Sequence, residues 1–209
     1  MRTITNRYTG EQITFLQTME EVNGEFLYIE VALPSLGKGP PLHVHDEFEE
    51  EFEVVSGTLT ITVEKEEKEL TAGQQLLAPK GVKHTFNNKY EEPVVFRVKL
   101  TPGLYFEESA RIHYGLMVDG LTNDKGEPTK LAHTALILSM QNTLVVGLPV
   151  GLQRKLFGWI VKRAYNNQSI NKEPYKTRLF LFCESLIVII SKTKPIKSER
   201  LNSIIASLL

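Results

Sequence analysis

From about residue 12 to residue 100, apolar and polar residues alternate in short runs that are rich in β-branched and aromatic side chains. Gly, Pro and Asn interrupt these runs, as they commonly do in turns between strands. The pattern predicts short strands at residues 13–18, 26–33, 42–45, 52–55, 58–63, 75–78, 83–86 and 94–100. Many short strands of this kind are typical of a closed barrel or of two packed β-sheets.

After Pro102 the spacing changes, because apolar residues now recur every three or four positions, which is the pattern of helices. It predicts helices at 106–117, 131–146 and 152–165, with a loop rich in turn-forming residues at 119–128. Residues 179–190 are almost entirely apolar and fit a buried helix as well as a strand. We therefore expect a β-barrel domain over residues 1–105 and a helical extension over residues 106–209.

Composition narrows the class of protein. A chain of 209 residues with 23% charged and 42% hydrophobic residues is typical of a folded globular protein, with room for one sizeable domain and an appendage. The formal net charge of −1 gives no reason to expect a nucleic acid partner. The charged run at residues 64–69 mixes both signs between two predicted strands, and we interpret it as a solvated hairpin.

The cysteine count and the first residues carry information about chemistry and location. Cys183 is the single cysteine, which excludes an intramolecular disulfide and a cysteine-rich zinc module. Any bound metal must then be held by His and carboxylate side chains, and we expect Cys183 to be an inert buried thiol. The first fifteen residues lack the apolar run of a secretory signal, which favours a cytoplasmic location.

Four residues in two segments carry the candidate chemistry. His43 and His45 are two residues apart in a predicted strand, so their side chains share one face. Glu50 follows five residues later, and the chain must turn or bulge between them to bring Glu50 back to that face. Pro79 and Gly81 predict a tight turn, which leads into the strand of the fourth residue, His84.

Three imidazoles and one carboxylate suit a single divalent transition metal ion such as Fe, Mn, Ni or Zn. A six-coordinate ion would keep two positions open beside such a set of ligands. We therefore expect His43, His45, Glu50 and His84 to bind one metal ion.

Other residues near these segments have simpler interpretations. His113 and His133 lie in predicted helices outside both segments, and we expect them to be ordinary histidines. Phe52 and Phe86 fit the lining of a pocket and a plain hydrophobic core equally well. A solvated rim is favoured over a second acidic layer for the acidic residues around Glu50, which are Asp46, Glu47, Glu49 and Glu51.

The two segments together resemble the paired signature motifs of the cupin superfamily. The matching fixed positions are Gly37, His43, His45, Glu50, Gly57, Gly73, Pro79, Gly81, His84 and Asn88. The resemblance covers roughly residues 12–105 and implies a jelly-roll β-barrel whose interior is lined by the histidines, and a homodimer. Residues 125–165 resemble the helical extension of some small bacterial cupin proteins.

The resemblance does not imply one reaction, because cupins host many chemistries. Our leading hypothesis is a metal-dependent oxidoreductase with non-haem, dioxygenase-like chemistry on a small organic molecule, in which Glu50 also takes part in catalysis. The alternative is a non-catalytic module that binds or senses a small molecule.

A third alternative, a structural or membrane-peripheral protein, rests on the predicted helix at residues 152–165. Its basic residues include Arg154, Lys155 and Lys162, and such a helix can lie on a membrane surface. We favour burial of its apolar stripe against protein. The stripe consists of Leu152, Leu156, Phe157, Trp159, Ile160, Val161 and Ala164.

Overall fold

The alternating runs form strands because β-branched and aromatic residues on every second position can be buried on one face of a sheet. A computed structural model of the protein describes residues 2–166. The predictions for residues 179–190 and for Cys183 lie outside the described residues.

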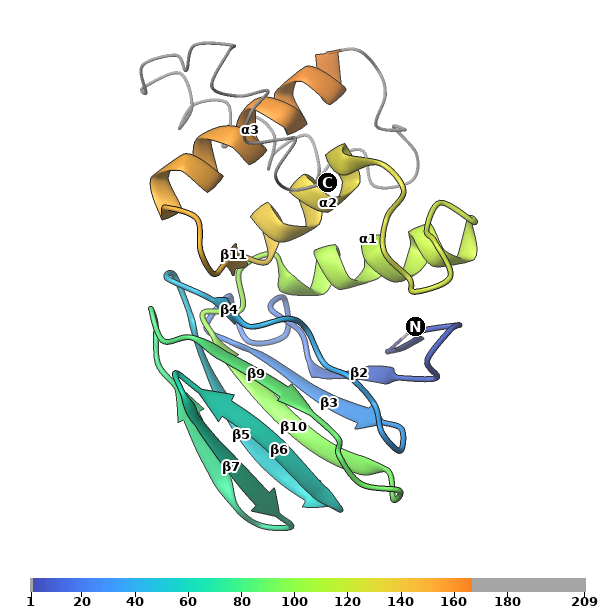
Figure 1. Cartoon of the computed structure of the whole chain (residues 1–209), viewed down its shortest axis with the longest axis vertical. Coiled ribbons are helices and arrows are strands. Elements are labelled where there is room, and N and C mark those ends of the chain that lie inside the picture. The colour runs from blue at the N-terminus through green and yellow to red at the C-terminus, as the bar shows by residue number, and fades with distance from the viewer. Residues whose placement is uncertain (1, 167–209) are drawn as a thin grey trace. The chain divides into compact units, whose positions relative to one another are not determined.

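The strands of the described part form two antiparallel sheets (Figure 1). The first sheet has the order β1 (Thr3–Thr5), β2 (Gln12–Gln17), β3 (Leu27–Leu33), β10 (Val94–Thr101), β5 (Glu49–Ser56) and β8 (Gln75–Ala78). The second has the order β11 (Leu144–Val145), β4 (His43–Val44), β9 (His84–Asn87), β6 (Thr58–Val63) and β7 (Glu66–Thr71).

The core lies between the inner faces of the two sheets. Every second residue of β3 and β10 is buried, as the alternation predicts. Phe52 of the first sheet lies 6.0 Å from Phe86 of the second, measured between ring centroids. Within the described residues the strands stay in two sheets and do not close into one hydrogen-bonded barrel, so the prediction is confirmed as a double-sheet arrangement only.

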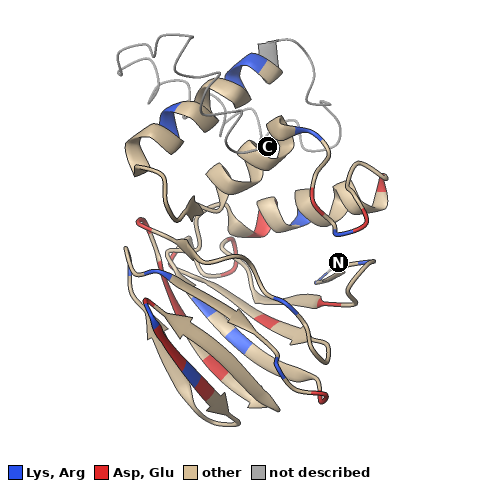
Figure 2. Ribbon diagram, viewed as in Figure 1, with Lys and Arg blue, Asp and Glu red and all other residues tan. Residues whose placement is uncertain are grey.

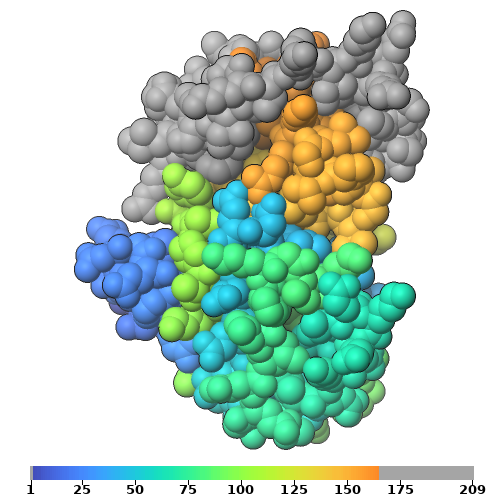
Figure 3. Space-filling view, turned by 90° about the vertical axis from the view of Figure 1, so that its left-hand side faces the viewer, coloured from blue at the N-terminus to red at the C-terminus, as the bar shows by residue number. Residues whose placement is uncertain are grey.

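The charged run at residues 64–69 forms a turn followed by most of β7, so the hairpin is confirmed. β7 lies at the edge of its sheet, and Figure 2 shows acidic and basic residues along it. Charged side chains on an edge strand oppose pairing with other chains. In the space-filling view of Figure 3, the residues of this part of the chain, coloured teal to green, gather on the face of the sheets that is turned to the viewer.

Three helices follow within the described residues: α1 (Phe106–Val118), α2 (Leu131–Met140) and α3 (Val150–Asn166). The predicted helix at 131–146 is too long, because the chain leaves the helix after Met140 and forms β11. Asn142 has a φ of 49°, a left-handed conformation that ends a helix. In this part of the chain, no helix has the length and apolar character that crossing a membrane requires.

The chain divides into two compact units. The boundary after residue 105, between a β-barrel domain and a helical extension, stays a prediction. The first unit contains residues 1–130 and 137–147, and thus all the strands found in residues 2–166, α1 and the end of α2. The second contains residues 131–136 and continues from residue 148, including α3.

On α3, Leu156, Phe157, Ile160, Val161 and Ala164 are buried, as predicted for the apolar stripe. Trp159 is 41% exposed and does not belong to the buried face. Arg163 is exposed as well. Its guanidinium lies 5.6 Å from the ring centroid of Trp159, because residues four apart share one side of a helix.

Candidate metal centre

The two sheets bring His43, His45, Glu50 and His84 together in the interior. His43 on β4 is the direct cross-strand partner of His84 on β9. One ligand atom from each of the four residues lies within 4.8 Å of the others, and all four side chains are buried. Glu50 reaches the group from β5, where it shares the inner face with Phe52 and Val54.

The segment between His45 and Glu50 carries the chain from one sheet to the other. β4 belongs to the second sheet and β5 to the first, and the chain is not a strand at residues 45–48. Glu50 therefore faces the histidines from the opposite sheet. The turn expected from the odd spacing is present, and the explanation is a crossing between sheets and not a bulge within one strand.

Backbone carbonyl groups fix the orientation of all three imidazoles. Nδ1 of His43 lies 2.8 Å from the carbonyl oxygen of Pro41, and Nδ1 of His84 lies 3.0 Å from that of Val82. Nδ1 of His45 lies 3.1 Å from the carbonyl oxygen of Asn142. A carbonyl oxygen can only accept a hydrogen bond, so each Nδ1 carries the hydrogen. Each Nε2 then points inward and presents a lone pair when the ring is neutral.

The spacing of these nitrogen atoms fits a shared cation. Nε2 of His43 lies 3.0 Å from Nε2 of His45, and two lone pairs at this distance repel each other. A proton or a metal ion between them removes the repulsion. Two ring nitrogens bound at about 2.1 Å and at right angles to one ion would lie about 3 Å apart.

Burial decides between a proton and a metal ion on this histidine pair. Burial, with the neighbouring charges of His45 and His84, lowers the pKa of His43 to about 4. Burial also lowers the pKa of His45. Both rings are therefore neutral near pH 7, and the donor set fits a divalent metal ion.

Glu50 and His84 form the charged half of the group. Oε2 of Glu50 lies 2.7 Å from Nε2 of His84 and 3.8 Å from Nε2 of His45. Burial opposes ionisation of Glu50, but the hydrogen bond with His84 and the nearby imidazoles outweigh it, and the pKa of the carboxyl is lowered. Burial opposes protonation of His84 in the same way, yet Glu50 raises the pKa of that ring.

Aromatic residues surround the group. Phe48 stacks on His45 with ring centroids 4.1 Å apart, and its side chain is fully buried. Phe52 lies 6.3 Å from His84 in an edge-on arrangement and packs on Phe86 and Phe96. Phe52 and Phe86 are thus parts of the hydrophobic core next to the site. Phe48 was not predicted, although an isolated aromatic residue among acidic residues was a signal for a buried position.

The remaining histidines lie outside the group. His113 on α1 donates from Nε2 to the carbonyl oxygen of Gly126 at 2.8 Å. His133 is buried on α2. Asp46 and Glu47 are exposed, while Glu49 and Glu51 lie on the outward-facing positions of β5. The acidic residues therefore form a solvated rim.

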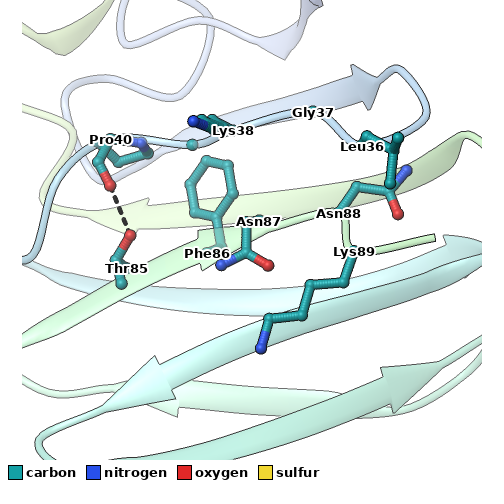
Figure 4. Close-up of a pocket in the computed structure, with 10 residues that line it drawn as sticks. Leu36, Gly37, Lys38, Pro40, Thr85, Phe86, Asn87, Asn88 and Lys89 are labelled. Atoms are coloured by element: carbon teal, nitrogen blue, oxygen red, sulfur yellow. Dashed lines mark hydrogen bonds between the residues drawn. The ribbon is translucent and has the colours of Figure 1, made fainter.

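A shallow groove of about 500 Å³ lies elsewhere on the surface, between residues 36–40 and β9 (Figure 4). The ring of Phe86 reaches from β9 toward the backbone of Gly39. Thr85 donates a hydrogen bond to the carbonyl oxygen of Pro40 across the groove. These contacts hold the segment that leads into His43 against β9.

Comparison with known families finds a match to the part of the chain that contains the four residues. A family model described as "Cupin domain" matches residues 30–101, which include all four residues of the group. Residues 30–101 thus match a cupin domain. No curated protein matches the chain.

Solved structures similar to this chain include three of bacterial origin. The protein TT1209 from Thermus thermophilus is 26% identical, with a TM-score of 0.37 over 38% of this chain and 75% of its own. A sugar phosphate isomerase of the cupin superfamily from Silicibacter pomeroyi is 24% identical, with a TM-score of 0.42 over 46% and 62%. A predicted oxalate decarboxylase from Thermotoga maritima is 18% identical, with a TM-score of 0.43 over 48% and 90%.

Proposed function

We propose that this cupin is a metal-dependent oxidoreductase that acts on a small organic molecule by non-haem, dioxygenase-like chemistry. The observation that carries the proposal is the convergence of three inward-facing Nε2 atoms and one carboxylate, with no hydrogen available between His43 and His45 near neutral pH. A bound Fe, Mn, Ni or Zn ion would supply a Lewis acid with two further coordination positions.

Glu50 is the candidate catalytic residue as well as a metal ligand. Its lowered pKa keeps the carboxylate ionised, and its hydrogen bond partner His84 has a raised pKa. With a metal ion bound by His84 and Glu50, the hydrogen bond between Nε2 and Oε2 would be replaced by bonds to the ion. The carboxylate oxygen of Glu50 that does not bind the ion would then be the base that takes a proton from an acidic C–H or O–H group of a substrate bound beside it.

A second candidate function, a non-catalytic binding or sensor module, draws support from burial. None of the four residues is more than 7% exposed. Metal sites with a purely structural role are closed, whereas catalytic sites keep an open position. In this alternative the small molecule binds and alters the fold without being converted.

Metal content tests the centre itself. Protein purified without a metal-affinity step should contain about one divalent transition metal ion per chain, measured by elemental analysis. His84→Ala should lose most of this metal, because it removes both a ligand and the hydrogen-bond partner of Glu50. His113→Ala is the matched control. The ring of His113 is hydrogen-bonded to the carbonyl oxygen of Gly126, away from the four residues, so this substitution should leave the metal content unchanged. Full metal content in His84→Ala would refute the centre.

Turnover separates the enzyme from the sensor. The Fe(II)-loaded protein should consume O₂ with at least one member of a panel of enolisable and catecholic compounds, measured with an oxygen electrode. Glu50→Gln should abolish this consumption. Tight binding of one compound, seen as a thermal shift without turnover by any metal-loaded form, would replace the enzyme with the sensor.

We also propose that the protein is a cytoplasmic homodimer that binds no nucleic acid. The first fifteen residues favour the location, the family resemblance implies the dimer, and the net charge gives no reason to expect a nucleic acid partner. Sedimentation velocity gives the oligomeric state, and a monomer at micromolar concentration would contradict the dimer.

A further inference from the structure

Asn142 contacts the segment that contains His45, although it lies outside the residues matched by the cupin family model. Its backbone carbonyl accepts the hydrogen bond from Nδ1 of His45 at 3.1 Å. Its side-chain Oδ1 accepts hydrogen bonds from the backbone N–H groups of Asp46 at 2.8 Å and Glu47 at 3.0 Å. Its Nδ2 donates to the Asp46 carboxylate at 2.9 Å.

The end of α2 places Asn142 in this position. The N–H of Asn142 donates to the carbonyl of Ser139 at 3.2 Å, and the N–H of Thr143 donates to that of Leu138 at 2.8 Å. Together with the left-handed φ of 49° at Asn142, these bonds form a Schellman motif. Asn is among the few residues that adopt this conformation readily, because its short polar side chain can bond locally.

The residues after Asn142 extend the contact along the strand of the site. β11 pairs with β4 in antiparallel register, with Leu144 opposite Val44 and Val145 opposite His43. The metal-site strand β4 is only two residues long, and β11 pairs with both of them. Residues 142–145 therefore support both histidines of the His-x-His segment.

The crossing between the sheets explains why this support is needed. Residues 45–48 leave the second sheet to reach β5, so their N–H groups have no partner strand. Buried or partly buried N–H groups need acceptors, and Asn142 supplies the acceptor for two of them. Asn142 is itself only 7% exposed, so water does not readily replace it.

We propose that Asn142 is a positioning residue of the metal centre, which rests on the metal-binding function proposed above. It fixes the ring of His45 through the backbone carbonyl and holds the crossing segment through its side-chain amide. The sequence after α2 thus completes a centre whose ligands all come from the cupin domain. Groups that orient a ligand histidine in this way typically change metal affinity by about 10- to 100-fold when lost.

Two substitutions separate the contributions of the side chain. Asn142→Gly keeps the left-handed backbone accessible but removes all three side-chain hydrogen bonds. Asn142→Asp keeps an oxygen acceptor for the N–H groups of Asp46 and Glu47. It loses the N–H donor to the Asp46 carboxylate and places a second negative charge next to it. The matched control is Asn23→Gly, because Asn23 also has a left-handed φ, of 52°, and lies in the exposed turn before β3.

The test measures Zn(II) affinity by competition with a chromophoric chelator, and the visible spectrum of the Co(II)-loaded full chain. Asn142→Gly should bind Zn(II) about 10- to 100-fold more weakly and shift the Co(II) bands. Asn142→Asp should show a smaller loss, and it carries the test if the Gly variant does not fold. Asn23→Gly should match the wild type in both measurements.

The outcomes distinguish this inference from the proposed function. Wild-type Zn(II) affinity and an unchanged Co(II) spectrum in the folded Asn142 variants would overturn the positioning role and leave the metal centre intact. A lower melting temperature with unchanged metal binding would assign Asn142 a structural role only, and would also overturn it. If the wild type itself binds neither ion, the proposed function and the positioning role fall together.

Discussion

Glu50 sets the protonation of the histidine that it contacts, and this has a consequence for metal binding. Burial alone would lower the pKa of His84, but the hydrogen bond and the charge of Glu50 raise it above its ordinary value of about 6.5. Below the raised pKa the ring holds a proton on Nε2, and a metal ion must displace it. The affinity for metal should therefore rise as the pH increases through the pKa of His84.

Zn(II) affinity measured between pH 5 and pH 9 checks this expectation. In the wild type the steepest rise should lie above about pH 6.5, the ordinary histidine range. The Glu50→Gln variant should bind Zn(II) more weakly, because a proposed ligand is altered. The rise of its Zn(II) affinity should move to lower pH, because the charge that raises the pKa of His84 is gone. An identical pH profile in both proteins, once scaled to the same maximum, would contradict the assignment of Glu50 as the cause.

At the same scale, the sequence predicted the four clustered residues but not Asn142. His43 and His45 are two residues apart and share a face by strand geometry alone, so local spacing was sufficient. Asn142 follows His45 by 97 residues, and its contact depends on the point at which α2 ends. Spacing along the chain carries no information about such a contact.

Among the elements, most predicted strands are confirmed within a residue or two, and the missed ones have physical reasons. β1 and β11 are three and two residues long, too short for an alternating pattern. β7 is a charged edge strand with only Leu70 buried, so it shows no apolar face. The helix predicted at 131–146 was too long because Leu144 and Val145 continue the apolar pattern of the sequence, although the left-handed Asn142 has already ended the helix.

The crossings between sheets depend on individual glycines, and two of them can be compared. Gly57 joins β5 in one sheet to β6 in the other, and Gly73 precedes β8 after a similar change of sheet. Both have left-handed φ values, of 80° and 84°. A Cβ at Gly57 would lie 2.6 Å from the carbonyl oxygen of Pro93, whereas a Cβ at Gly73 would have no neighbour within 4 Å.

Replacing each glycine by alanine should therefore give different losses of stability. Gly73→Ala should lower the free energy of unfolding by about 1 kcal/mol, from backbone strain alone. Gly57→Ala should lower it by about 2–4 kcal/mol, because the backbone near Pro93 must also move. Urea denaturation of the two variants measures the difference. Equal decreases in the free energy of unfolding would show that the close approach at Gly57 does not affect stability.

For the whole molecule, the remaining question is whether the basic, amphipathic α3 directs the protein to a membrane. The apolar residues expected to insert into lipid are buried in the structure, with Leu156 2% and Val161 1% exposed. On the exposed side are Trp159, Arg154 and Arg163, with the guanidinium of Arg163 near the indole ring. One aromatic ring and a few cations, at about 1 kcal/mol each near an anionic surface, give weak membrane binding.

We therefore expect the protein to stay in the supernatant when it is sedimented with phosphatidylserine-containing vesicles at physiological salt. Leu156→Glu should unfold the helical part or destabilise it by about 3 kcal/mol or more, because it buries an unpaired charge. Trp159→Glu places the same charge on the exposed side of the same helix and should change the melting temperature little. Because Trp159 is exposed, this variant stays folded and can test the membrane alternative directly. Strong vesicle binding by the wild type that Trp159→Glu abolishes would show that the exposed side of α3 meets lipid.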